Sequence, residues 1–242
     1  YNFIANSFSL IDGFGGKIQA PEYGEINVRV KVFGEHSLRP IIGAVAVSAK
    51  LGLSSQEIIG GLVSLKPIPG RMNFMRGVED SVLIDDTYNS SPAALEAAIQ
   101  TLYALSAPSK IAIIGSMNEL GESSAFEHQK IGEMLDGIAL SWVITVGEQA
   151  NRFLAPAARL RGCQVYEAKN AIDAGIFAHR IMEKGALVLL KGSQGEVYLE
   201  ETVKMLLRNR EDEKMLVRQD ENWKKIKDEF FSSFSEIAED EV

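Results

Sequence analysis

Between residues 71 and 208 the sequence alternates short apolar segments with stretches of helical length, and this alternation restricts the possible folds most. Five apolar segments have the length of β-strands: 82–85, 111–114, 142–146, 164–167 and 187–190. Strands that alternate with helices along a chain predict a parallel sheet with helices on both faces. The clearest expected helix starts at Ser91 and Pro92, which suit a helix N-terminus. We therefore predict a doubly wound, mostly parallel α/β domain over 71–208.

The segment 1–66 follows a different pattern, and we interpret it as a separate domain portion. Alternating apolar side chains predict strands at 7–11 and 26–33, and two short helices are expected after them. The segment KPIPG at 66–70 has two prolines and a glycine in five residues, which interrupts both helix and strand. We place the domain boundary there.

The glycine-rich stretch GFGGKI at 13–18 invites comparison with a phosphate loop. That motif needs a glycine and a hydroxyl residue at the positions where Ile11 and Ile18 stand. We therefore expect a turn that connects two strands, and the sequence contains no phosphate loop.

Charge and cysteine usage narrow the class of protein. The formal net charge is -8 and the pI is near 5.1, whereas binding to nucleic acid or to a membrane surface needs clustered Lys and Arg. The single cysteine, Cys163, cannot form an internal disulfide, and the amino terminus does not have the pattern of a signal peptide. We expect a cytoplasmic protein without a nucleic-acid or membrane partner.

The tail at 209–242 is the most charged part of the chain, with eleven acidic and six basic residues. It also contains large apolar residues, many of them at helical spacing: Leu216, Trp223, Ile226, Phe230, Phe231 and Phe234. This combination predicts a helix that packs on its own domain. A helix that binds a partner is the alternative.

Polar clusters follow several predicted strands, and the carboxyl ends of parallel strands are where such folds bind ligands. The clusters are DDTYNSSP (85–92), GSMNELGESS (115–124), GEQ (147–149) and KGSQG (191–195). Asp85 and Asp86 repel one another unless a cation lies nearby, and Lys191 is the candidate for that cation. Each cluster also has a purely structural interpretation, as a strand end or a turn, and taken singly His36 and His128 are each expected to be structural and not catalytic.

Taken together and in order, these segments resemble the Mur ligase family over about residues 26–208. The resemblance lies in PGRM (69–72), in DDTYNSSP, in GSMNELGESS followed by EHQKIG (127–132), and in KGSQG. DDTYNSSP and GSMNELGESS are most similar to the loops of members that add D-alanyl-D-alanine to a UDP-MurNAc-peptide. The resemblance implies a Rossmann-like carboxy-terminal domain preceded by the end of a central, ATP-binding domain.

By this resemblance the chain is an incomplete portion of an ATP-dependent amide ligase that works through an acyl phosphate. ATP and Mg²⁺ would be held mainly by a phosphate loop and metal ligands in an upstream domain, so we expect no activity from this portion alone. The residues expected at the nucleotide are His36, Arg71, Asp86 and Asn89. The residues expected at the other substrates are Tyr88, Glu119, Lys191 and Ser193. No residue is assigned to a metal or to catalysis.

Several positions depart from the family pattern. Ser91 replaces an asparagine, Ser116 an aspartate and Gln194 an arginine, while GEHSLRP at 34–40 keeps only the glycine and His36 of the segment that holds adenine. A noncatalytic binding module with the ligase fold is therefore the main alternative function. A receiver-like signalling domain is a remote one, because WVITVGEQ at 142–149 offers no acceptor aspartate.

Overall fold

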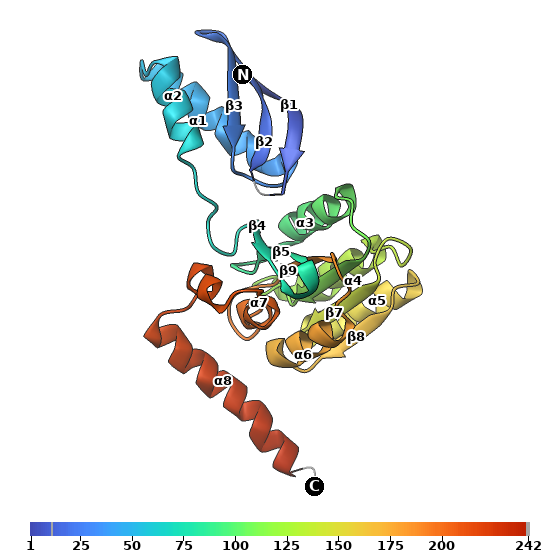
Figure 1. Ribbon diagram of the computed structural model, residues 1–242. Coiled ribbons are helices and arrows are strands. Elements are labelled where there is room, and N and C mark those ends of the chain that lie inside the picture. The colour runs from blue at the N-terminus through green and yellow to red at the C-terminus, as the bar shows by residue number, and fades with distance from the viewer. Residues whose placement is uncertain (11, 241–242) are drawn as a thin grey trace. The chain divides into compact units, whose positions relative to one another are not determined.

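The computed structural model describes residues 1–10 and 12–240, and the chain divides into two compact units, Tyr1–Ile68 and Pro69–Val242 (Figure 1). The division falls inside the KPIPG segment, where two prolines and a glycine prevent regular structure.

The first unit is a three-stranded antiparallel sheet packed against helices. The strands pair in the order β1 (Asn2–Ser9), β2 (Gly13–Ala20) and β3 (Gly24–Val30). The short 3-10 helix η1 (Glu35–Ser37) and the helices α1 and α2 follow, at Leu38–Lys50 and Ser55–Val63. Apolar side chains of the sheet and of both α-helices form one core.

The prediction of a turn at 13–18 is wrong, because this stretch lies within the central strand β2. Its glycines allow the neighbouring strand β1 to approach closely. A Cβ at Gly15 would stand 2.5 Å from the Ser7 hydroxyl, and one at Gly16 would stand 2.3 Å from the Ile4 carbonyl oxygen. Phe14 and Ile18 on the same strand are buried. The strand continues into a second strand and not into a helix, so it is not a phosphate loop.

The second unit is built on a six-stranded sheet with the order β4-β5-β9-β6-β7-β8. The strands are β4 (Asn73–Arg76), β5 (Val82–Asp86), β6 (Lys110–Gly115), β7 (Trp142–Val146), β8 (Val165–Ala168) and β9 (Leu187–Lys191). Every pairing is parallel except that of β4 with β5. The five predicted strands are confirmed to within two residues at each end, and the short edge strand β4 is additional.

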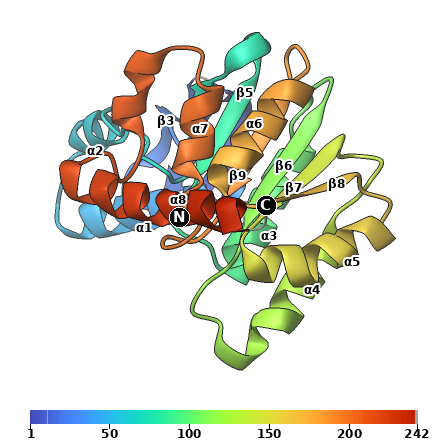
Figure 2. The same ribbon diagram turned by 90° about the horizontal axis from the view of Figure 1, so that it is seen from below.

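Helices cover both faces of this sheet, which confirms the doubly wound α/β class (Figure 2). On one face lie α3 (Pro92–Ala104), α4 (Ser124–Met134), the π-helix η4 (Ala150–Leu154) and α5 (Ala155–Leu160). On the other lie α6 (Ala171–Ile181) and α7 (Glu200–Leu206). Short 3-10 helices occur at η2 (Val78–Asp80), η3 (Gly121–Ser123) and η5 (Arg210–Met215).

The strand order excludes the receiver-like interpretation. Receiver domains place five parallel strands in the order 2-1-3-4-5. In the second unit the last strand of the chain, β9, lies between the first two parallel strands, β5 and β6. The two topologies cannot be interconverted without rethreading the chain.

The tail is part of the second unit. The helix α8 (Glu221–Asp240) begins after η5, and Phe231 on α8 packs against the core on the α6 and α7 side of the sheet. Among residues 1–10 and 12–240, no helix combines the length and the apolar character needed to cross a bilayer.

Candidate functional site

Three loops meet beyond the carboxyl ends of β5, β6 and β9, and Ser193 connects them. The Ser193 hydroxyl accepts a hydrogen bond from the Asn118 backbone N–H at 2.9 Å and donates to the Ser90 carbonyl oxygen at 3.4 Å. Its backbone N–H donates to the Ser116 carbonyl oxygen at 3.2 Å. Ser193 is only 1% exposed. The loops that carry the family-like motifs therefore form one assembly, with Ser193 at its centre.

Asp86 and Lys191 form a buried ion pair at this edge. They are register partners at the ends of adjacent parallel strands, and Lys191 Nζ lies 2.7 Å from Asp86 Oδ2. The other carboxylate oxygen accepts the Met72 N–H at 3.0 Å, and Lys191 Nζ donates to the Asn89 carbonyl oxygen at 3.0 Å. A buried pair is tolerated when such hydrogen bonds satisfy its remaining capacity. The expectation that Lys191 supplies a cation to the acidic pair is confirmed for Asp86.

Asp85 has a different environment, although it is the neighbour of Asp86. It is fully buried and accepts hydrogen bonds from the Thr87 hydroxyl at 2.6 Å, the Thr87 N–H at 3.3 Å and the Gly70 N–H at 3.1 Å. Burial raises the pKa of Asp85 to about 6, while the hydrogen bonds from Thr87 and Gly70 oppose that rise. Its role in the fold is to fix the PGRM segment to the end of β5.

Arg71 and Tyr88 form the exposed part of the site. The Arg71 guanidinium carbon lies 4.3 Å from the centroid of the Tyr88 ring, and that ring is 40% exposed. Beneath them the Tyr88 N–H donates to the Gly70 carbonyl oxygen at 3.0 Å. Gly70 has φ +65°, and a Cβ there would stand 2.9 Å from the Tyr88 nitrogen, so only glycine fits. An accessible cation on an aromatic face suits an anionic ligand with a planar group.

The start of α3 provides a second feature that suits an anion. Ser91 is the N-cap residue in extended conformation, yet its side chain makes no capping hydrogen bond, contrary to the expected role of Ser91. Next to it the Ser90 hydroxyl is buried and has no partner among the described protein groups. A helix N-terminus carries partial positive charge and unpaired N–H groups. Ser90 and the first turn of α3 therefore offer donors to a carboxylate or a phosphate.

His128 fixes the loop after β6 by hydrogen bonding. Its Nε2 accepts the Met117 N–H at 2.8 Å and its Nδ1 lies 2.7 Å from the Ser124 carbonyl oxygen, which fits a proton on Nδ1. Burial lowers the pKa of His128, which favours this neutral form. The expected structural role of His128 is confirmed. Glu119, on the same loop, is exposed and has φ +64°.

Seven of the eight residues predicted at ligands lie at this edge of the sheet: Arg71, Asp86, Tyr88, Asn89, Glu119, Lys191 and Ser193. Glu119 lies on the loop after β6, which Asn118 also joins to the carbonyl oxygens of Gln194 and Gly195. His36 is in η1 of the other unit. Their contacts with ligands stay predictions. Within the described ranges, no group of three or more His, Cys, Asp or Glu residues is placed to hold a metal ion.

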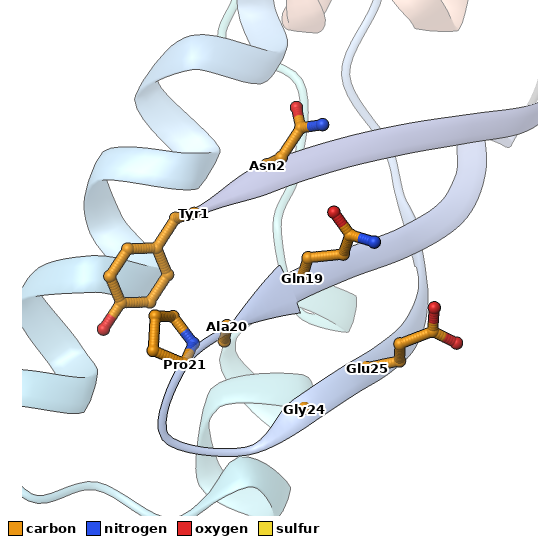
Figure 3. A pocket seen from close by; sticks show the side chains of 7 residues that line it. All are labelled: Tyr1, Asn2, Gln19, Ala20, Pro21, Gly24 and Glu25. Atoms are coloured by element: carbon orange, nitrogen blue, oxygen red, sulfur yellow. The ribbon is translucent and has the colours of Figure 1, made fainter.

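The first unit has an open hollow of its own (Figure 3). It is lined by Tyr1, Asn2, Gln19, Ala20, Pro21, Gly24 and Glu25. None of the predicted ligand residues lies there, and its walls offer one carboxylate and two amides without a cation. It carries no candidate chemistry.

Two residues that the sequence did not suggest also contact the site. Arg218, from the tail, donates to the carbonyl oxygens of Thr87 at 2.7 Å and Tyr88 at 3.1 Å. Glu200, at the start of α7, is fully buried beside it. Neither belongs to a motif, and both are charged residues in charged stretches, so no local signal distinguishes them.

Comparisons with known proteins show similarity of sequence. Residues 70–194 match the family model described as "Mur ligase, glutamate ligase domain". The UDP-N-acetylmuramoyl-tripeptide--D-alanyl-D-alanine ligase of Escherichia coli K12 is 28% identical over 192 residues, which are 79% of this chain and 41% of that protein. The Bacillus subtilis ligase of the same name is 29% identical over 184 residues, 74% of this chain and 39% of that protein.

The fold also matches solved structures. A crystal structure of MurF from Acinetobacter baumannii is similar with a TM-score of 0.72 and 27% identity, over 86% of this chain and 45% of that one. MurF from Thermotoga maritima in complex with ADP gives a TM-score of 0.68 at 24% identity, which supports the fold alone, over 87% of this chain and 46% of that one. The chain spans only about two fifths of the length of the curated relatives it matches.

Proposed function

Because this chain belongs to the Mur ligase family, we propose that it is the carboxy-terminal portion of an ATP-dependent ligase that adds D-alanyl-D-alanine to a UDP-MurNAc-peptide. The observation that carries the proposal is the assembly of the family-like loops around Ser193 and the Asp86–Lys191 pair. The two relatives compared above carry the name of that ligase.

The proposed reaction has two steps. The peptide carboxylate attacks the γ-phosphorus of ATP, which gives an acyl phosphate and releases ADP. The amine of the dipeptide then attacks the acyl carbon, loses a proton, and displaces inorganic phosphate from a tetrahedral intermediate. Since the sequence has no phosphate loop, we propose that the transferred phosphate is held by residues outside this portion and that this portion binds and orients ligands.

The site suits anionic ligands at two places. Arg71 on the face of Tyr88 is accessible and would take the nucleotide. The Ser90 hydroxyl and the start of α3 would take a carboxylate, which the dipeptide carries at its free end. Lys191 would act indirectly, because it is already bound to Asp86 and to the Asn89 carbonyl oxygen.

The carboxylates of this portion do not fit a magnesium site. Asp85 already accepts three hydrogen bonds, from Thr87 and Gly70, and Asp86 is already bound to Lys191 and to the Met72 N–H. Magnesium prefers carboxylate oxygens that keep room for water and phosphate oxygens. We therefore place no metal ligand in the part of the chain that the structure describes.

Calorimetric titration tests the binding half of the proposal. Magnesium-ATP and D-alanyl-D-alanine are titrated separately into the wild-type chain, into Arg71→Gln and into the control Arg208→Gln, which removes another exposed arginine, paired with Asp80. We expect weak, saturable nucleotide binding that Arg71→Gln abolishes and the control retains. Equal binding by both variants would refute the role of Arg71.

A chimera tests the catalytic half. The second unit, Pro69–Val242, replaces the corresponding portion of the Escherichia coli relative, and phosphate release that depends on D-alanyl-D-alanine is measured. We expect turnover above that of a chimera carrying Arg71→Gln. A folded chimera that binds ATP without turnover would support the noncatalytic binding module instead.

A further inference from the structure

Arg218 binds the loop at 87–88 with its whole guanidinium group. Nε and one terminal nitrogen donate hydrogen bonds to the two carboxylate oxygens of Glu200, at 2.8 and 2.7 Å. The same side chain donates to the carbonyl oxygens of Thr87 at 2.7 Å and Tyr88 at 3.1 Å. A planar guanidinium can make this set of bonds at once, whereas a lysine ammonium cannot. Arg218 therefore fixes both the position and the orientation of two consecutive peptide groups.

The charges around Arg218 are removed from water. The side chains of Arg218 and Glu200 are 4% and 0% exposed. Lys227 on α8 is equally buried, lies 3.6 Å from Glu200 and forms an ion pair with Glu201. Two buried cations thus face two carboxylates in a cluster that joins α7, α8 and the loop, and Lys204 extends it from Glu201 to Glu213. Replacing such clusters with apolar residues often leaves stability unchanged, so stability alone does not explain the cluster.

Packing around the cluster holds the tail in the same place. Val217 is buried, and its Cγ1 would stand 2.9 Å from a Cβ placed on Gly70. Trp223 lies 5.9 Å from the Arg218 guanidinium, and Tyr198 contacts the rings of Trp223 and Phe230. Arg218 itself has φ +55°, a backbone conformation that persists only when its surroundings enforce it. The tail is therefore packed to present Arg218 to the loop.

We infer that the segment 209–231 is a clamp for the ligand-binding loop and that Arg218 is its positioning residue. By fixing the Thr87 and Tyr88 carbonyl groups, Arg218 sets the Tyr88 ring beneath Arg71 and orders the chain that leads to Asn89 and Ser90. Arg218, Glu200 and Lys227 all lie beyond the residues 70–194 that match the family model. The clamp therefore lies outside the part of the chain that the family model matches, and its effect on ligands rests on the proposed function.

Hydrogen exchange on the full chain tests the clamp without any ligand. Arg218→Lys keeps the charge and removes the paired hydrogen bonds to Glu200. Arg208→Lys makes the same substitution at the exposed ion pair with Asp80. We expect the Tyr88 amide to exchange about 10-fold faster in Arg218→Lys, as expected for the loss of charge-assisted hydrogen bonds. Amides of β6 and β7 should exchange as in the wild type, and the control should change nothing.

The outcomes separate the clamp from the proposed function. Unchanged exchange at Tyr88 in folded Arg218→Lys overturns the clamp. If Arg218→Lys does not fold, the same measurement is made on Arg218→Met combined with Glu200→Gln, which leaves no unpaired buried carboxylate; unfolding of both also overturns it. Faster exchange together with weaker magnesium-ATP binding supports both inferences. Faster exchange in Arg218→Lys, together with a folded wild-type chimera that shows no turnover, supports the clamp and refutes the proposed function.

Discussion

Two buried ion pairs hold the loop at 87–90, and they come from different parts of the molecule. Asp86 and Lys191 stand on adjacent strands of the sheet, so the backbone places them. Glu200 and Arg218 join a helix start to the tail, and side-chain packing places them. The lysine reaches one carboxylate oxygen and one carbonyl, whereas the arginine reaches both carboxylate oxygens and two carbonyls. The shared sheet supplies a simple contact to the loop, and the tail supplies a more restrictive one.

The largest effect is expected for Arg218→Met. It leaves Glu200 with Lys227 alone and two buried carbonyl groups without donors. We expect the free energy of unfolding to fall by about 5 kcal/mol, the upper range for a broken buried pair. Urea denaturation of the full chain measures it. A loss below that of Lys191→Met would reverse the ranking of the two pairs.

Lys191→Met should lower the free energy of unfolding somewhat less, by about 4 kcal/mol, because Asp86 keeps the hydrogen bond from Met72. The double variant Asp86→Leu with Lys191→Met removes both charges and should recover more than half of that loss in the same denaturation experiment. A double variant no more stable than Lys191→Met would show that the hydrogen bonds to Met72 and Asn89, and not the unpaired charge, account for the loss.

Asp85, near the end of β5, is a buried carboxylate whose hydrogen-bond donors are all neutral. Its pKa is raised from 3.8 to about 6, so the folded state binds the proton more tightly than the unfolded state. Stability must therefore fall as pH rises between about 4 and about 6, by about 3 kcal/mol in total. The test is the difference in unfolding free energy between the wild type and Asp85→Asn from pH 4 to pH 7. A difference independent of pH would contradict the raised pKa.

The smallest effect on stability is expected for Arg71→Gln. Its guanidinium is exposed on the Tyr88 ring, and such contacts contribute about 0.5–1 kcal/mol at the surface. Thermal unfolding should hardly change, while nucleotide binding is lost. A large loss of stability would assign Arg71 to the fold and weaken its proposed role at the ligand.

The sequence was sufficient to predict the Asp86–Lys191 pair because parallel strands end at a common edge. That rule holds whatever the order of the strands, so it did not matter that the central place of β9 was unknown. The same rule brought Ser193 and the loop after β6 to the site. These contacts could be predicted from the local sequence because they join residues at or just beyond the ends of strands.

The features that the sequence did not predict depend on contacts between distant segments. The glycines of GFGGKI suggested a turn, but they allow a neighbouring strand to approach closely. The strand β4 has four residues and no alternating pattern of its own, and it forms by pairing with β5. Arg218 meets Thr87 across 131 positions of the chain, and nothing near it in the sequence records that contact.

The central place of β9 has a consequence for synthesis on the ribosome. The strands β5, β6, β7 and β8 are synthesised before β9, yet in the sheet β5 and β6 are connected only through β9. Until Leu187–Lys191 emerges, both strands expose unpaired backbone edges, which are prone to pair with other chains. The nascent domain therefore closes in one late step of high contact order, and that step also delivers Lys191 to Asp86.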